Sequence, residues 1–230
     1  MLKQKTVAAI HDISGIGKCS LTGAIPVLSA AGISVSAMPT AVLSTQTGGI
    51  SGYTYRDLTD DLRAFMEHWK TLDKTFDAVY SGFLGSETQI DIVSDFVRDF
   101  SREDTLYLCD PAMADNGELY SVFNNNFVEA MKRLCANADI IVPNFTEAFL
   151  LLDMEYSAPP YTKAFTERIL NNLAAKYNAK YIVLTGADFD GKSVGAASLD
   201  VQSGNITYSL RPRIKGMFHS TGDLFASSLL

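Results

Sequence analysis

The feature that most constrains the fold is a regular alternation between short apolar runs and amphipathic helical patterns. Apolar runs without polar alternation predict buried strands at residues 6–10, 33–38, 78–81, 105–109, 140–142 and 181–184. Apolar residues at helical spacing predict helices over 20–31, 58–72, 86–100, 127–136, 146–152 and 162–177. Uninterrupted apolar strands are typical of parallel sheets that are buried on both faces. We therefore predict an α/β fold with a mostly parallel central sheet and helices on both faces.

Two segments depart from this alternation. Residues 194–199 and 206–210 are joined by Ser203-Gly204-Asn205, which predicts an antiparallel hairpin. Pro39 is expected to end the second strand, and the polar stretch 40–55 that follows is rich in Ser, Thr and Gly. A loop of that length in a compact domain is usually functional or disordered.

Composition limits the classes of partner. A chain of 230 residues with 47% hydrophobic content predicts one domain over residues 1–230. The net charge is −7 without a block of like charges, which argues against nucleic acid or a membrane as partner. Cys19, Cys109 and Cys135 have no metal-ligand or redox spacing, so we interpret them as buried thiols. No signal peptide or membrane span is evident, and a cytoplasmic location is predicted.

The C-terminal stretch 216–226 contains small polar residues that lead into an apolar run. We expect a helix with Ser220 or Thr221 as N-cap and Asp223 in its first turn. First-turn amides lack intrahelical partners, so they form a ready anion site, and Gly222 allows close approach of a ligand. The alternative is that Asp223 only complements the helix dipole.

Polar residues follow most of the predicted strands. Because ligands of parallel sheets bind at the carboxyl ends of the strands, these residues are expected along one rim. The set comprises Asp12, Ser14, 40–49, 81–86, Asp110, Asn144, Glu147, Thr185, Gly186 and 216–223. Their convergence favours a chemical role for Asp223.

Two familiar nucleotide motifs are absent. A P-loop ending at Gly17-Lys18 requires glycine at position 12 and a hydroxyl at position 19, but the chain has Asp12 and Cys19. No Gly-x-Gly-x-x-Gly follows a strand either. Lys18 is either a surface lysine or a phosphate contact, and the sequence leaves that choice open.

Ser220-Thr221-Gly222-Asp223 resembles the Gly-Thr-Gly-Asp signature of the ribokinase superfamily. Over its whole length the chain resembles the vitamin B6 kinases of that superfamily, which phosphorylate pyridoxal, pyridoxine or pyridoxamine. The supporting segments lie in order at predicted strand ends: 40–48, 81–86, 109–113, 142–147 and 211–212. The resemblance implies a ribokinase-like fold and ATP-dependent phosphorylation of the 5′-hydroxymethyl group.

The resemblance also implies roles for individual residues. Asp223 would be the base. An anion hole at Ser220, Thr221 and Gly222, with the amides of Thr221, Gly222 and Asp223 as donors, would hold the γ-phosphoryl oxygens. Mg²⁺ would be held by Asp110 and Glu147, directly or through water, and a monovalent cation is a further option. The implied nucleotide-binding residues are Asp110, Asn144, Glu147, Thr185, Arg211, Pro212, Arg213 and Ile214.

On the acceptor side, either Asp12 or Ser14 corresponds to the first-loop residue that meets the pyridine ring. Thr47 and Gly48 match substrate-covering positions, and the glycines of 48–52 would let that segment close over the site. Phe83 stands at a ring-flanking position where several relatives carry tyrosine. Asp223 would also contact the acceptor, and the family implies a homodimer.

Departures from the family pattern leave alternatives open. Ser220 replaces the first signature glycine, and the chain stops at Leu230 within the predicted helix, so we expect a truncated sequence. The nearest rival is hydroxymethylpyrimidine or hydroxymethylpyrimidine-phosphate kinase, whose first loop the His11–Gly15 segment slightly resembles. A non-catalytic protein that binds vitamin B6 or a nucleotide is the alternative from another class.

Overall fold

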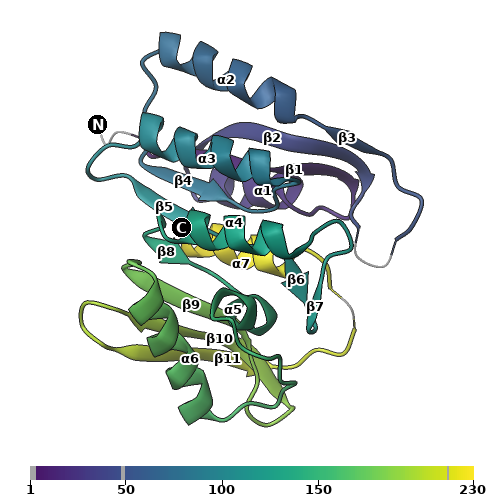
Figure 1. The fold of residues 1–230 in the computed structure, drawn as a ribbon, viewed down its shortest axis with the longest axis vertical. Helices are drawn as coiled ribbons and strands as arrows, with labels where there is room; N and C mark the ends of the chain where they lie inside the picture. The colour runs from purple at the N-terminus through teal and green to yellow at the C-terminus, as the bar shows by residue number, and fades with distance from the viewer. Residues whose placement is uncertain (1–3, 48–49, 217) are drawn as a thin grey trace. The chain divides into compact units, whose positions relative to one another are not determined.

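The computed structural model describes residues 4–47, 50–216 and 218–230. The chain forms two compact units, coloured by residue number in Figure 1. Unit 1 comprises Met1–Leu108 and Phe218–Leu230, and unit 2 comprises Cys109–Met217. That residues 1–230 form a single domain stays a prediction.

Unit 1 is built on five strands in the order β5-β4-β1-β2-β3. They are β1 (Thr6–Ile16), β2 (Ser34–Thr45), β3 (Tyr55–Asp57), β4 (Ala78–Ser81) and β5 (Leu106–Cys109), whose last residue opens unit 2. The long central strand β1 pairs in parallel with β2 and β4, while β3 is antiparallel to β2. Residues 7–10 of β1 are buried, as expected for a strand covered on both faces.

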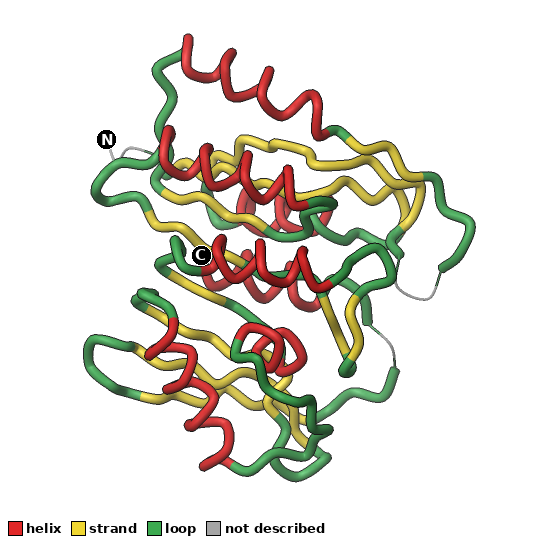
Figure 2. Tube along the Cα trace, in the orientation of Figure 1, coloured by secondary structure: helices red, strands yellow, loops and turns green. Residues whose placement is uncertain are grey.

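Four helices belong to unit 1: α1 (Leu21–Ala30), α2 (Thr59–Thr71), α3 (Glu87–Phe100) and α7 (Thr221–Leu229). Helices α2 and α3 lie on one face of these strands, whereas α1 and α7 lie on the other (Figure 2). Trp69 of α2 contacts the rings of Phe96 and Phe100 of α3, and Ser86 caps α3 by accepting a hydrogen bond from the Gln89 amide. This layered arrangement brings the N-terminus of α7 beside that of α1.

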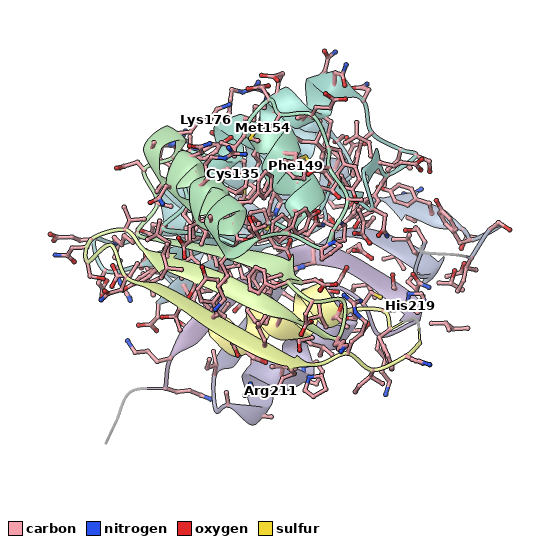
Figure 3. The ribbon with its side chains drawn as sticks, turned by 90° about the horizontal axis from the view of Figure 1, so that it is seen from below. Cys135, Phe149, Met154, Lys176, Arg211 and His219 are labelled. Atoms are coloured by element: carbon pink, nitrogen blue, oxygen red, sulfur yellow. The ribbon has the colours of Figure 1, made fainter. Side chains whose placement is uncertain are left out.

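The larger group of paired strands described in unit 2 has the order β11-β10-β9-β8. They are β8 (Ile140–Ile141), β9 (Tyr181–Ala187), β10 (Ser193–Asp200) and β11 (Ile206–Pro212), and only β8 and β9 pair in parallel. The helices are α4 (Asn125–Cys135), α5 (Phe145–Leu151) and α6 (Lys163–Lys176). Phe149 and Lys176 lie on the helical side of β11, whereas Arg211 lies on the other side (Figure 3).

Most of the predicted strands and helices are confirmed, and so is the antiparallel hairpin of β10 and β11. A short second hairpin, β6 (Ala114–Asp115) with β7 (Glu118–Leu119), is missing from the sequence-based assignment. Strands this short carry too few residues for a period-two pattern to be recognised.

The boundaries predicted for the first two strands are wrong. Strand β1 continues past its predicted end at Ile10 to Ile16, and β2 runs past Pro39 to Thr45. Pro39 pairs with His11 where the register shifts, and pairing resumes at Ile13 with Val42. A proline lacks an N–H group, and a bulge is one of the few places where a strand tolerates it.

The cysteines behave partly as predicted. Cys109 and Cys135 are buried free thiols whose sulfur atoms lie 3.8 Å apart, although they are distant in sequence. Cys19 is half-buried, so its assignment as a buried thiol is wrong. Over the described residues, the longest helices are too short or too polar to cross a membrane.

Candidate active site

Asp223 lies in the first turn of α7, as predicted, and is half-buried. Its Oδ2 atom accepts a hydrogen bond from the Ser20 amide at 3.0 Å and another from the Ser220 hydroxyl at 2.9 Å. Among the described residues, no lysine or arginine pairs with this carboxylate, and Oδ1 accepts no hydrogen bond. One carboxylate oxygen is therefore held, and the other is available.

Ser220 occupies the N-cap position of α7, but it does not cap the helix. Its backbone is left-handed, with φ of 63°, and its side chain makes no capping hydrogen bond. Within the described part of the chain, the amides of Thr221, Gly222 and Asp223 donate no hydrogen bonds. These are the donors predicted to hold an anion, and they stand at the positive end of the helix dipole.

The loop before α1 completes this corner of unit 1. Ser20 is buried and has an unusual backbone, with φ of 55° and ψ of −128°. Its amide reaches Asp223 across 203 residues of sequence. Nothing in the local sequence around Ser20 indicates this contact, because it depends on the packing of α1 against α7.

Asp12 and Ser14 are both buried in the extended part of β1. The Ser14 hydroxyl donates to Asp12 Oδ2 at 3.0 Å. Burial raises the pKa of Asp12, and hydrogen bonds from Ser20 and Ser14 partly offset that effect. The two candidates for the first-loop residue thus form one hydrogen-bonded pair, and the choice between them becomes less important.

Cys19 and His11 flank these carboxylates, and both remain uncharged near neutral pH. Burial, followed by the charges of Asp223 and Asp12, raises the pKa of the Cys19 thiol to about 11. Burial lowers the pKa of His11 to about 4, against the opposing pull of Asp223. The His11 ring packs edge-on against Tyr80, and neither ring nitrogen makes a hydrogen bond to the described residues.

Other acceptor-side predictions also fall in unit 1. Thr47 is exposed just after β2, and Phe83 is half-buried after β4, where its carbonyl accepts a hydrogen bond from Thr40. Gly48 lies outside the described residues. Tyr55 of β3, which sequence reasoning missed, lies against Gly85: a Cβ atom there would stand 2.3 Å from the Tyr55 hydroxyl.

The residues predicted to bind nucleotide and metal all belong to unit 2. Asn144 caps α5 by accepting a hydrogen bond from the Glu147 amide, and Glu147 Oε2 accepts one from the Asn144 amide at 2.8 Å. Glu147 Oε1 also accepts from the Met113 amide at 3.2 Å. Burial raises the pKa of Glu147 to about 8, although these backbone hydrogen bonds favour its charged form.

Asp110 follows a strand, as predicted, whereas the prediction that a strand ends before Thr185 is wrong because β9 continues to Ala187. Asp110 is half-buried directly after β5, and Thr185 lies within β9, where it bridges to Asn144. The Thr185 amide donates to the Pro143 carbonyl at 2.9 Å. Thr185, Asn144 and Glu147 are thus gathered at the N-terminus of α5.

The stretch 211–214 is exposed, with its first two residues at the end of β11. Arg213 forms a 2.7 Å ion pair with Asp188, a buried carboxylate that sequence reasoning missed. Asp188 also accepts hydrogen bonds from the amides of Asp190 and Gly191, which fixes the turn between β9 and β10. That the site residues of the two units share one rim stays a prediction.

The comparisons with known proteins decide the family. Residues 25–230 match the family model described as phosphomethylpyrimidine kinase. The chain belongs to this family. The family is one of kinases within the ribokinase superfamily, and the fold class predicted from the sequence is confirmed.

Solved structures and curated proteins give the same result. A crystal structure from Bacteroides thetaiotaomicron, provisionally assigned as a phosphomethylpyrimidine kinase, is 39% identical, with a TM-score of 0.93 over 98% of this chain and 77% of that one. A second crystal form of that protein contains pyridoxal. Pyridoxal kinase from Lactobacillus plantarum is 32% identical, with a TM-score of 0.87 over 98% of this chain and 78% of that one.

Human pyridoxal kinase is 25% identical over 96% of this chain and 74% of its own length. The matches to the fission yeast and nematode relatives span less than half of those proteins, 46% and 47%. The predicted resemblance to vitamin B6 kinases is therefore confirmed as a distant relationship.

Proposed function

We propose that this protein is a pyridoxal kinase that transfers the γ-phosphoryl group of ATP to the 5′-hydroxymethyl group of a B6 vitamer. The observation that carries the proposal is the corner formed by α1 and α7. Asp223 there has one hydrogen-bonded oxygen, one open oxygen and no cationic partner among the described residues, beside three amides without acceptors. A base next to an anion hole is what phosphoryl transfer to an alcohol requires.

The reaction would proceed at Asp223 Oδ1. This oxygen takes the proton of the acceptor hydroxyl as the alcohol oxygen forms a bond to the γ-phosphorus. The bond between that phosphorus and the β,γ-bridging oxygen breaks, and ADP leaves with the bonding electron pair. The amides of Thr221, Gly222 and Asp223 would stabilise the negative charge on the oxygens of the transferred group.

Asp12 and Ser14 would recognise the vitamer ring. Their buried, hydrogen-bonded pair offers a carboxylate and a hydroxyl in a site where an unmatched polar ligand group would be costly. Thr47, Gly48 and Phe83 would cover or flank the ring. The related protein crystallised with pyridoxal supports this choice of acceptor.

Magnesium would be held in unit 2. Carboxylate oxygens with water suit this ion, and Asp110 and Glu147 supply such oxygens. Because both Glu147 oxygens already accept backbone hydrogen bonds, we favour contact through water for Glu147. When bound, the ion would neutralise charge on the ATP phosphates. Asn144, Thr185 and residues 211–214 would contact the nucleotide.

The rival acceptor is hydroxymethylpyrimidine or its phosphate, which the name of the matching family favours. A coupled assay of ADP release separates the two. The protein is offered ATP and Mg²⁺ with pyridoxal, pyridoxine, pyridoxamine, hydroxymethylpyrimidine or hydroxymethylpyrimidine phosphate in turn. We expect turnover on at least one B6 vitamer, with a higher kcat/KM than for either pyrimidine. Turnover on the pyrimidines alone would reject the proposal.

A non-catalytic binding protein is tested in the same experiment. It would bind a vitamer or ATP in calorimetry but release no ADP with any acceptor. A homodimer and a cytoplasmic location stay predictions, and sedimentation velocity of the purified chain measures the first.

A further inference from the structure

We propose that the Ser220 hydroxyl is a positioning group for Asp223, which pins Oδ2 so that Oδ1 is presented to the acceptor hydroxyl. Gly23 of α1 is required because it leaves space for that hydroxyl. The proposal rests on the proposed function, since it assigns Asp223 as the base.

Two donors converge on a single oxygen of the carboxylate. The Ser220 hydroxyl and the Ser20 amide both donate to Oδ2, at 2.9 and 3.0 Å. The terminal torsion of an aspartate is broad and nearly two-fold, so the side chain alone does not select which oxygen faces a substrate. Two hydrogen bonds to the same oxygen make that selection, because rotation about the torsion breaks both.

The left-handed backbone of Ser220 indicates that its side chain has a role. With φ of 63°, residue 220 is left-handed, a conformation that glycine adopts without steric cost and serine adopts uncommonly. The side chain does not cap the helix, and its hydroxyl instead reaches Asp223 within the same turn. The hydrogen bond from the Ser220 hydroxyl to the Asp223 carboxylate offsets the unfavourable left-handed conformation of the Ser220 backbone.

Gly23 supplies the second, independent observation. A Cβ atom at this position would stand 2.7 Å from Ser220 Oγ and 2.8 Å from the Lys18 carbonyl oxygen. Gly23 is not among the residues with positive φ, so its backbone does not demand glycine. Glycine inside a helix is unfavourable, which leaves the close approach of the Ser220 hydroxyl and the 17–20 loop as the reason for it.

Two substitutions at position 220 separate the hydroxyl from the backbone. Ser220→Ala and Ser220→Gly both remove the hydroxyl, but only glycine relieves the left-handed strain. We expect both variants to lower kcat about tenfold while the KM values for ATP and vitamer stay within about twofold.

The matched control is Ser228→Ala, which removes an exposed serine hydroxyl of the same helix that bonds to the Leu224 carbonyl. If Ser220→Gly retains the kcat of the parent chain, the hydroxyl does not position the base and the proposal is overturned. A second test is the cycle of Gly23→Ala with Ser220→Gly. The loss of kcat from Gly23→Ala should be smaller when the Ser220 side chain is absent, and equal losses contradict the role of Gly23.

Failure of the proposed function is recognised separately. If the parent chain phosphorylates no alcohol, the kinase proposal fails, and the positioning role of Ser220 is judged by crystal structures of the parent chain and of Ser220→Gly. The Asp223 carboxylate should keep one orientation in the parent chain, with Oδ2 at the Ser20 amide, and should lose that single orientation in the variant. An unchanged carboxylate orientation in Ser220→Gly overturns the proposal without reference to turnover.

Discussion

Asp223 of α7 and Glu147 of α5 occupy the same position, three residues after the N-cap of a helix, yet the two units use them in opposite ways. Glu147 reaches back to the Asn144 amide in a capping box and also accepts from Met113. The Asp223 side chain accepts no hydrogen bond from the amides of its own helix among the described residues. It accepts hydrogen bonds from the distant Ser20 amide and from the Ser220 hydroxyl instead. The Glu147 carboxylate caps the start of its helix, whereas the Asp223 carboxylate leaves the first-turn amides of its helix without a side-chain acceptor.

The difference shows how a helix N-terminus becomes a candidate for chemistry. Four N–H groups at the start of any helix need acceptors. In α5 the capping box satisfies two of them and buries the acid, whose pKa rises to about 8. In α7 the first-turn amides have no acceptors among the described residues, so a bound anion is what would satisfy them.

The largest effect is expected from Asp223→Asn. Asparagine keeps the size of the side chain but removes the base, so kcat should fall about 10²–10⁴-fold while ligand affinities are retained. Assays of ADP release measure the loss of kcat, and calorimetry with vitamer and with ATP measures the ligand affinities. A variant with nearly parental kcat would remove the distinction between the two carboxylates.

The main effect expected of Glu147→Ala is a loss of stability. The kinetic constants for the acceptor should change less. The substitution leaves the buried Met113 N–H and the part-buried Asn144 N–H without acceptors, at about 1–3 kcal/mol each, so we expect a loss of about 2–6 kcal/mol in the free energy of unfolding. Urea denaturation measures it. Glu147→Gln is the control, because glutamine keeps one acceptor oxygen for the capping box but places an NH2 donor where the second oxygen stood, so about half of the loss is expected.

The two units should also respond to pH in opposite directions. The folded pKa of His11, about 4, lies below its unfolded value near 6.5, so its contribution is fully present above pH 6.5 and is lost as pH falls toward 4. The folded pKa of Glu147, about 8, lies above its unfolded value near 4.5, so its contribution is present below pH 4.5 and is lost as pH rises toward 8. Between about pH 4.5 and 6.5 the two contributions change in opposite directions and offset each other, so stability in metal-free buffer should decline mainly as pH rises above 6.5, where only Glu147 still titrates.

Two variants assign the limbs of that profile. His11→Asn should remove the loss on the acid side, so that stability falls continuously from about pH 4.5 to 8, whereas Glu147→Gln should remove the loss above pH 6.5 and leave a decline of up to about 3 kcal/mol as pH falls from 6.5 to 4. Urea denaturation at half-unit pH intervals measures both. Loss of the same limb in both variants would contradict the assignment.

The smallest effect is expected from the caps themselves. Asn144→Ala should lower the free energy of unfolding by about 1 kcal/mol, the usual cost of removing a capping side chain. Ser220→Ala should cost less, because Ser220 makes no capping hydrogen bond. Equal losses, measured by thermal unfolding, would indicate that Ser220 has a structural role similar to that of Asn144.

Sequence periodicity predicted most elements of the fold because apolar residues dominate the strands and one face of each helix. Predictions failed where pairing overrode local signals: Pro39 was expected to end β2, but pairing with β1 resumes beyond the bulge. The site residues implied by the family resemblance lie in the two units as described above. Ser20, Gly23 and Asp188 were missed, because their roles depend on neighbours far away in sequence.

By itself the sequence determined the α/β class, the alternation of its elements and the presence of an acidic residue at the start of the last helix. These follow from local spacing and from the hydrophobic pattern, which each segment carries without its partners. Only the tertiary structure decided which acid is capped and buried and which keeps a free oxygen, because hydrogen-bond acceptance and desolvation are set by groups that folding brings together from distant parts of the chain.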